Sequence, residues 1–263
     1  MTRSERLHQW LWLVLALSIG LSLASVGLLD PARLGRGAMN ISIFVTALFP
    51  PNPRVLGTVT KAMLETIQIA FAGTMLGFAL ALPLALAATR TLMGPTASSP
   101  ARLLLALIRT VPSLLWGIIF VVAVGLGPAA GTLGIALYSA GYLGKILYET
   151  LEGVDPEVVE AVRSVGCGRL QLARYALLPE AANHILAQLL FILEYNIRAS
   201  SIMGFVGAGG IGFYLLGYIQ MLQYDSLSTA LLVTLLVVVA VDWLSARIRR
   251  SVLHMGAAVQ PGT

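Results

Sequence analysis

The sequence predicts an all-α integral membrane protein with about six transmembrane helices. Of its 263 residues, 57% are hydrophobic and only 11% are charged, and the mean hydropathy is +0.85, far outside the range of a soluble domain. Its apolar runs approach the roughly 20 residues that a helix needs to cross about 30 Å of hydrocarbon. We expect an N-terminal anchor helix and extracytoplasmic loop over 1–60, a membrane core over 61–250 and a cytoplasmic tail over 251–263.

The first apolar run, from about Trp10 to Leu29, follows Arg3 and Arg6 and has the pattern of a secretory signal peptide, with a possible cleavage near LSLAS. Its length favours a retained anchor instead. The other five spans are expected at about Ala62–Ala88, Leu103–Leu126, Gly131–Tyr148, Asn183–Met203 and Ser226–Ala246. Within the third span, Leu103–Leu126, Arg109 and Pro112 are expected to separate an interfacial turn from the span itself.

The distribution of basic residues predicts that both termini are cytoplasmic. With that orientation most of the 17 Lys and Arg residues flank the spans on the inner side, and only Arg33, Arg36 and Arg54 lie outside. Such an asymmetry follows the positive-inside rule. The same scattering along the span ends argues against a nucleic-acid partner, whose binding would require clustered basic and aromatic residues.

One long cytoplasmic connection, about residues 149–182, carries its own helix signals. Asp155 can cap a helix that has Pro156 at its first position and ends at Gly166 and Gly168. A second short helix is expected from Arg169 toward Pro179. An apolar stripe at helical spacing is formed by Val158, Ala161, Val162 and Val165. This pattern leaves two alternatives open, a helix lying on the membrane surface and a helix that docks on a cytoplasmic partner.

The stretch EAVRSVGCGRLQLARYALLP, residues 160–179, resembles the cytoplasmic EAA loop of the permeases of binding-protein-dependent ATP-driven importers. The family pattern is Glu-Ala-Ala, three residues, Gly, nine residues, Ile, one residue and Leu-Pro. Five residues stand in register: Glu160, Ala161, Gly166, Leu178 and Pro179. Val162 and Ala176 depart from the pattern at two apolar positions, and neither change removes a charge or the glycine.

Two further stretches, residues 124–161 and 196–212, resemble the phosphonate-type permeases, and Thr66–Arg90 does so more weakly. The resemblance implies a type I importer permease fold in the bacterial inner membrane. It also implies a homodimer around a translocation path, two cytoplasmic ATP-binding subunits that each receive an EAA loop, and an extracytoplasmic solute-binding protein. The implied substrate is a phosphorus oxyanion: phosphonate, phosphite or phosphate.

The sequence GAGGIG, residues 207–212, matches the G-x-G-x-x-G fingerprint of dinucleotide sites. Such a site follows a strand, whereas a membrane helix is expected here. We therefore expect a tight turn that packs against the dimer mate or the pore mouth, formed by Gly207, Gly209, Gly210 and Gly212.

Enzymatic chemistry is not expected in this chain. GYLGK, residues 141–145, lacks the spacing of a phosphate-binding loop, so ATP is expected to be used by a partner subunit. The single cysteine and the three histidines show no ligand spacing, so no metal and no bound cofactor are expected.

The fifth span contains two opposite charges, Glu194 and Arg198. Helical geometry places them on one face with Ser201, while Asn196 and Ser200 point roughly the other way. Counted from Asn183, Glu194 lies about 16 Å and Arg198 about 22 Å along the helix. We expect these five polar residues to line the path, where Arg198 offers a planar donor fork to phosphorus oxyanions. The alternative is an ion pair that only stabilises the bundle or the dimer.

Three classes of function remain. An importer permease for a phosphorus oxyanion, or for another small solute, accounts for the organised loop. An ion-coupled secondary transporter would use Glu194 as a relay, but the inverted repeats typical of many such proteins are not evident. A structural membrane scaffold would not need charges inside a span.

Overall fold

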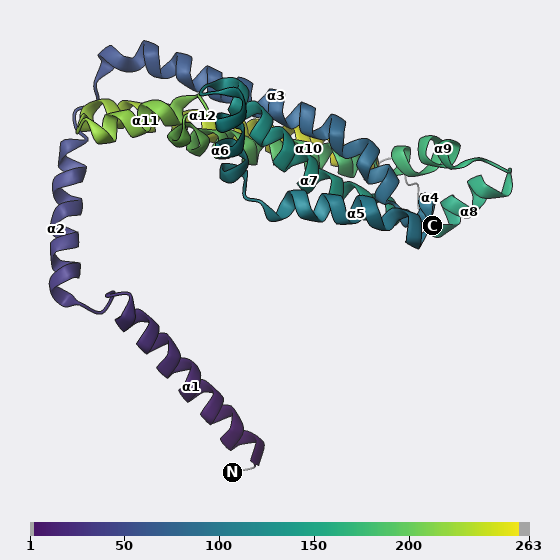
Figure 1. Ribbon diagram of the computed structural model, residues 1–263, viewed down its shortest axis with the longest axis horizontal. Coiled ribbons are helices and arrows are strands. Elements are labelled where there is room, and N and C mark those ends of the chain that lie inside the picture. The colour runs from purple at the N-terminus through teal and green to yellow at the C-terminus, as the bar shows by residue number, and fades with distance from the viewer. Residues whose placement is uncertain (1–2, 258–263) are drawn as a thin grey trace. The chain divides into compact units, whose positions relative to one another are not determined.

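The computed structural model describes residues 3–257, with side chains over 8–250, and this part of the chain is helical without any strand. The chain comprises two compact units, Met1–Pro51 and Asn52–Thr263. Figure 1 labels the helices.

The first unit contains α1 (Arg3–Ser25) and α2 (Pro31–Ala47). Asp30 caps α2, because its carboxylate accepts hydrogen bonds from the backbone N–H groups of Ala32 and Arg33 at 2.9 and 3.3 Å, and Pro31 occupies the first turn. A second helix thus lies where the sequence led us to expect a loop. No residue of α2 is buried, so its apolar side chains, like those of α1, are free to contact lipid.

Two long helices, α3 (Leu56–Ala88) and α7 (Pro128–Glu152), form the centre of the second unit. Glycines of α3 allow it to lie close to α7. A Cβ at Gly73 would lie 2.6 Å from the Ile135 side chain, and one at Gly77 would lie 2.6 Å from the Ser139 Cβ. Small residues four apart are a common means of packing membrane helices, since they let dispersion contacts and polar bonds form between backbones.

The expected break near Pro112 is present. Helices α5 (Pro95–Thr110) and α6 (Ser113–Val124) meet at an angle of 88°. Pro112 has no N–H to continue α5, and the residue before it, Val111, is extended with φ −88° and ψ 120°, as the proline ring requires. A four-residue helix, α4 (Arg90–Met93), precedes α5.

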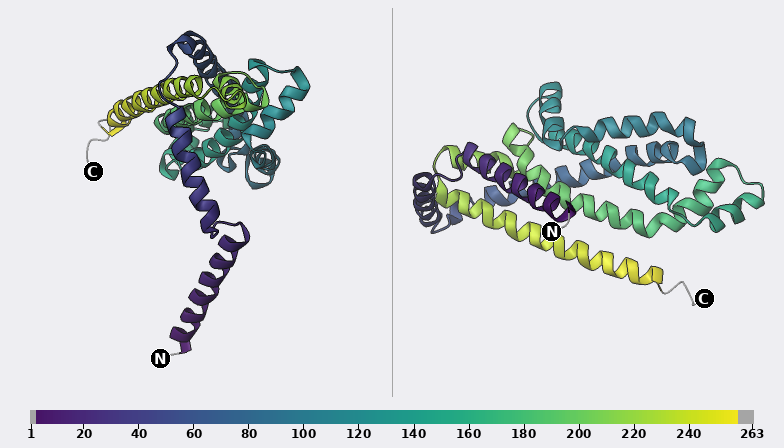
Figure 2. Two further views of the ribbon diagram at one scale, coloured as in Figure 1. Left: turned by 90° about the vertical axis from the view of Figure 1, so that its left-hand side faces the viewer. Right: turned by 90° about the horizontal axis from the view of Figure 1, so that it is seen from below.

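The C-terminal half of the second unit contains helices α8 to α12. Long helix α10 (Leu178–Met203) is followed by the 3-10 turn η3 (Gly204–Val206) and by α11 (Ile211–Gln220). The last helix, α12 (Tyr224–Ala257), packs along α10 and α3 at the edge of the bundle (Figure 2). The short elements α8 (Pro156–Ser164), α9 (Arg169–Leu172) and the π-helix η2 (Ala173–Leu177) connect α7 to α10.

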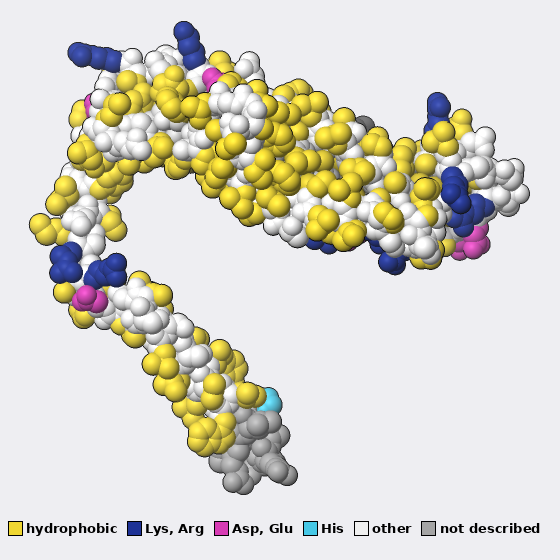
Figure 3. Space-filling model, in the orientation of Figure 1, with side chains coloured by type: hydrophobic (Ala, Val, Ile, Leu, Met, Phe, Trp, Pro, Cys, Tyr) yellow, Lys and Arg dark blue, Asp and Glu magenta, His cyan; other side chains and the backbone are white. Residues whose placement is uncertain are grey.

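Among the described residues, four helical stretches are long and apolar enough to cross a membrane, and the bent α5/α6 pair makes up to five. The fourth expected span lies within α7, a helix of 25 residues. This helix is glycine-rich and buried among its neighbours. It therefore does not need the apolar surface of a lipid-facing helix. In the second unit, apolar side chains cover the middle of the bundle while Lys and Arg gather toward its ends (Figure 3). The expected tail begins inside α12, and its residues 258–263 lie outside the described part.

Candidate functional site

The EAA-like segment folds largely from local signals. The Asp155 carboxylate accepts a hydrogen bond from the Glu157 N–H at 2.9 Å, and Pro156 occupies the first turn of α8. The helix ends at Ser164, and two residues later Gly166 has φ +80° and donates its N–H to Arg163 O at 2.9 Å. A left-handed residue after a helix end is most often glycine, because a Cβ there is strained. Beyond α9 the chain stays helical through η2 into α10, so Pro179 lies in the first turn of α10 and does not end a helix.

This segment, which we call the coupling segment (residues 155–178), has two faces. Its inner face packs into one apolar cluster that includes buried Val159, Leu172 and Leu177. On its outer face Val165, Leu170 and Tyr175 are 82%, 78% and 65% exposed. The expected apolar stripe is therefore divided: Val158 and Val162 are half-buried against the cluster, while Ala161 and Val165 point outward.

Four of the five residues of the EAA pattern lie in this segment, and Pro179 follows it directly. Glu160, Ala161, Gly166 and Pro179 are exposed, and Leu178 is half-buried. An exposed large apolar patch on an otherwise charged, helical loop is typical of a protein interaction site.

The glycine-rich stretch forms a turn between η3 and α11. Gly207, Gly209 and Gly210 all have positive φ, between 76° and 83°. The turn is fixed to α3 by two side chains, since Gly210 N–H donates to the Glu65 carboxylate at 2.9 Å and Ile211 N–H donates to the Thr66 hydroxyl at 2.8 Å.

Gly212 allows α11 to approach α10 closely, because a Cβ there would lie 2.0 Å from the carbonyl oxygen of Ser201. The four glycines thus set a backbone turn at the end of α10. The expected packing against a dimer mate stays a prediction.

Three of the five expected path residues are buried between helices of the same chain. Asn196 is fully buried and donates hydrogen bonds of 2.8 Å to both Thr74 Oγ1 of α3 and Ser139 Oγ of α7. Ser200 is also fully buried, and its hydroxyl has no partner among the described residues. Ser201 is 7% exposed and donates to Ile197 O. Helical spacing predicts the relative directions of these side chains, but it does not show which face of α10 packs against other helices.

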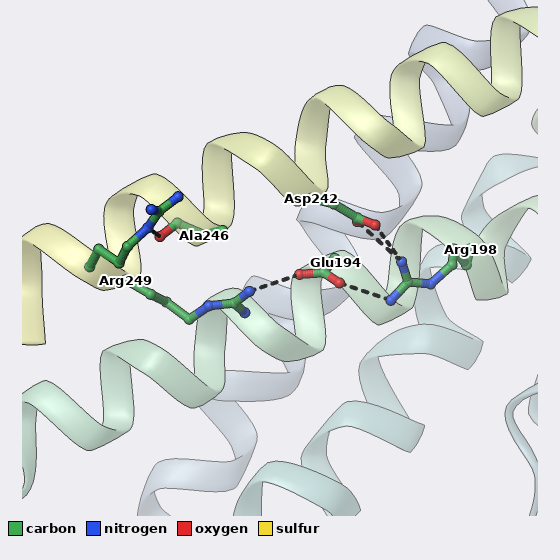
Figure 4. Close-up of polar contacts among 6 residues, drawn as sticks. Glu194, Arg198, Asp242, Ala246 and Arg249 are labelled. Carbon is green, nitrogen blue, oxygen red and sulfur yellow. Dashed lines mark hydrogen bonds and ion pairs between the residues drawn. The ribbon is translucent and has the colours of Figure 1, made fainter.

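Glu194 and Arg198 belong to a cluster of four charges between α10 and α12 (Figure 4). The Arg198 guanidinium donates to the Glu194 carboxylate at 3.0 Å and to both carboxylate oxygens of Asp242 at 3.1 and 3.2 Å. Arg249 donates to the other Glu194 oxygen at 3.3 Å. Two carboxylates and two guanidinium groups make the charged cluster formally neutral.

Asp242 and Arg249 were not expected at this site. Asp242 is the only acidic residue within the sixth predicted span, and an ionisable residue inside an apolar run is itself a signal of function or pairing. Arg249 belongs to the RIRR run after that span. Its pairing places Glu194 nearer the arginine-rich end of α12 than the count from Asn183 suggested.

Two cavities open beside the charged cluster. One of about 320 Å³ is lined by Ser113 and Leu114 at the start of α6 and by Tyr195, Arg198, Ala199, Ile202 and Met203 of α10. The other, of about 580 Å³, includes Glu194 and Arg249 in its lining. The side chains of Arg198 and Asp242 are 43% and 41% exposed, whereas that of Glu194 is only 12% exposed, so Arg198 is the more accessible of the two cations.

Comparison with known proteins defines the class of this helical bundle. Residues 55–254 match the family "Binding-protein-dependent transport system inner membrane component". The chain belongs to this family and is therefore an inner-membrane protein and a component of a transport system. The match begins within one residue of α3 and covers the coupling segment, the glycine turn and the charged cluster.

Among its relatives, the phosphite transport system permease protein PtxC of Stutzerimonas stutzeri is 38% identical over 226 residues, which cover 86% of this chain and 82% of the relative. The phosphate-import permease protein PhnE of Mycolicibacterium smegmatis is 37% identical over 212 residues, 80% of this chain and 40% of that longer protein.

Solved structures show the same fold. An inward-facing MetNI methionine ABC transporter aligns over 76% of this chain and 99% of its own chain, with a TM-score of 0.64 and 23% identity. A bacterial alginate ABC transporter aligns over 93% and 98%, with a TM-score of 0.57 and 16% identity. The chain thus has the ABC importer permease fold.

Proposed function

We propose that this chain is the permease subunit of an ATP-driven importer for a phosphorus oxyanion, namely phosphite, phosphonate or phosphate. The observation that carries the substrate class is the 38% identity to a phosphite permease over 86% of the chain. A second phosphite transport relative from the same organism, itself named as putative, is 36% identical over 84% of the chain. Each alignment covers about four-fifths of the relative, so the similarity extends over most of each permease.

The coupling segment is proposed to dock on a separate ATP-hydrolysing subunit. Its three exposed apolar side chains stand on short helices whose inner face is already filled by the apolar cluster. A face of this kind suits a groove in a soluble partner better than lipid, because charged residues such as Glu160 and Arg169 surround it. In this proposal ATP is bound and used by that partner, and this chain holds no cofactor.

The complete assembly is proposed to contain two copies of this chain, two ATPase subunits and an extracytoplasmic solute-binding protein. Both termini and the coupling segment lie in the cytoplasm. This orientation is supported by the basic flanks, and it places the RIRR run at the inner surface.

Arg198 is proposed to contact the anion in the translocation path, at the cavity of about 320 Å³. Its guanidinium is already bonded to two carboxylates, which moderates its attraction for an anion. A carrier must release its substrate, so a partly neutralised arginine suits passage better than a lone one.

The proposal is tested by uptake into proteoliposomes that contain this chain, its ATPase and its solute-binding protein. We expect ATP-dependent accumulation of at least one of radiolabelled phosphate, phosphite or methylphosphonate. Uptake of none of them by an assembled, ATP-hydrolysing complex would contradict the substrate class.

A second arm separates the importer from an ion-coupled carrier. This chain alone, under an imposed proton gradient, is expected to accumulate nothing. Glu194 forms ion pairs with Arg198 and Arg249, so its carboxylate is already engaged and we assign it no relay role. Gradient-driven uptake without the ATPase would overturn the importer assignment.

A further inference from the structure

The short helix α4 joins α3 to α5 and lies against the coupling segment. Its residue Leu92 is 7% exposed and belongs to the same apolar cluster as Val159 of α8 and Leu172 of α9. The core beneath the coupling helices is therefore completed by a side chain from a different part of the sequence.

Polar contacts tie both coupling helices to the same four residues. Arg163, in the last turn of α8, donates from Nη2 to the carbonyl oxygen of Thr91 at 2.6 Å. Arg169, the first residue of α9, has its guanidinium 4.0 Å from Met93 Sδ. Each coupling helix thus touches α4 through a long cationic side chain as well as through the apolar cluster.

On the side of the membrane helices, the backbone N–H of Arg90 in α4 donates to Glu152 at the end of α7, and Arg102 links the helix ends around it. Arg102 of α5 forms an ion pair with Glu152 at the end of α7 and donates to Ala88 O at the end of α3 at 2.8 Å. Its guanidinium also lies 4.4 Å from the ring centroid of Tyr148. The side chains of this pair are only 19% and 25% exposed. This one arginine therefore links the ends of α3, α5 and α7.

The chain itself attaches the coupling segment only to α7 and α10. Contacts through α4 add α3 and α5, and α5 leads through the bend at Pro112 into α6, whose first residues line the cavity beside Arg198. A displacement of α8 would thus be carried by packed side chains and hydrogen bonds, without relying on the covalent connections alone.

We infer that α4 transmits movement of the coupling segment to α3 and α5, and that Leu92 and Arg163 are positioning residues for energy coupling. This inference rests on the proposed function, because it assumes that an ATPase docks on the coupling segment. It assigns a role in transmission, distinct from docking: Leu92 is buried beneath the segment, and Arg163 reaches back toward the membrane domain.

The test compares Arg163→Gln and Leu92→Ala with Arg90→Gln in the reconstituted complex. Arg90→Gln removes the same charge from the same region, and its guanidinium has no hydrogen bond or ion pair among the described residues. Its backbone N–H, which bonds Glu152 at 2.5 Å, is unchanged. The readouts are ATPase copurification, ATP hydrolysis and substrate transported per ATP hydrolysed.

We expect Arg163→Gln and Leu92→Ala to retain the ATPase and its hydrolysis but to transport about three- to tenfold less substrate per ATP, while Arg90→Gln matches the wild type. A wild-type ratio in Arg163→Gln would overturn the inference, and so would its loss of the ATPase, since that result marks a docking residue. Should Leu92→Ala fail to fold, Arg163→Gln alone decides. Failure of the wild type to transport any oxyanion would instead overturn the proposed function.

Discussion

Replacing Asn196 by alanine should destabilise the helix bundle and leave substrate recognition intact. Its amide donates two hydrogen bonds of 2.8 Å, one to Thr74 and one to Ser139, so that one side chain of α10 ties α3 and α7 together. Hydrogen bonds between membrane helices contribute on average about 0.6 and at most about 1.7 kcal/mol each. Losing both therefore costs about 1–3 kcal/mol.

The measurement is unfolding by SDS titration, followed by circular dichroism, in mixed micelles. Ser200→Ala provides a matched control one turn along the same helix. Ser200 is equally buried, but its hydroxyl has no partner among the described residues, so its removal relieves an unsatisfied polar group and should be neutral or stabilising. The comparison sets a hydrogen-bonded buried side chain against one whose hydroxyl has no partner; because Asn196 Oδ1 also lacks a partner among the described residues, the hydrogen bonds themselves are isolated by a double-mutant cycle.

A double-mutant cycle with Ser139→Ala sharpens the assignment. If Asn196 and Ser139 interact as the 2.8 Å contact indicates, their coupling energy should be about 0.6–1.7 kcal/mol. Unchanged stability of Asn196→Ala together with lost uptake would refute this reasoning and place Asn196 in the path, as its polarity first suggested.

Four other substitutions test three separate features. Gly212→Ala should destabilise the fold by about 1–3 kcal/mol or more, because the new Cβ would lie 2.0 Å from Ser201 O. The control Gly217→Ala should not destabilise the fold, because a Cβ there would have nothing within 4 Å. Equal melting temperatures of the two variants would contradict this prediction. Asp155→Ala should destabilise α8 by about 0.5–2 kcal/mol while Asp155→Asn preserves the cap, as measured by hydrogen exchange; equal protection in both would exclude a capping role. Asp242→Asn should lower the apparent KM for the anion by freeing Arg198. Arg198→Ala should abolish uptake without loss of the ATPase. An unchanged KM in Asp242→Asn and retained uptake in Arg198→Ala would remove Arg198 from the path.

The coupling segment was predictable because its boundaries depend on neighbouring residues. Asp155 and Pro156 begin α8, and Gly166 with its positive φ ends it, so each signal acts within a few residues of its effect. The same local signals, Asp30 and Pro31, also begin α2. The sequence nevertheless predicts a loop there, because α2 has only 17 residues and a spanning helix needs about 20 apolar ones.

The charged cluster and the buried polar contacts were only half predictable. Sequence spacing gave the Glu194 and Arg198 pair, since residues four apart on a helix meet. It could not show that Asp242 and Arg249 complete the cluster, because those contacts depend on how α12 packs against α10. Asn196 illustrates the same limit, since the direction of its side chain is set by α3 and α7.

Neutrality of the charged cluster explains how a carrier can keep ionisable groups between two apolar helices. Each charge alone would cost on the order of 2.5–3.5 kcal/mol at the centre of a span, whereas Glu194, Arg198, Asp242 and Arg249 compensate one another within 3.3 Å. In the proposed path, an anion at Arg198 would compete with two carboxylates for the same N–H groups, which predicts weak binding and fast release. The proposal therefore assigns selection among tetrahedral oxyanions to the solute-binding protein and opening of the passage to the ATPase.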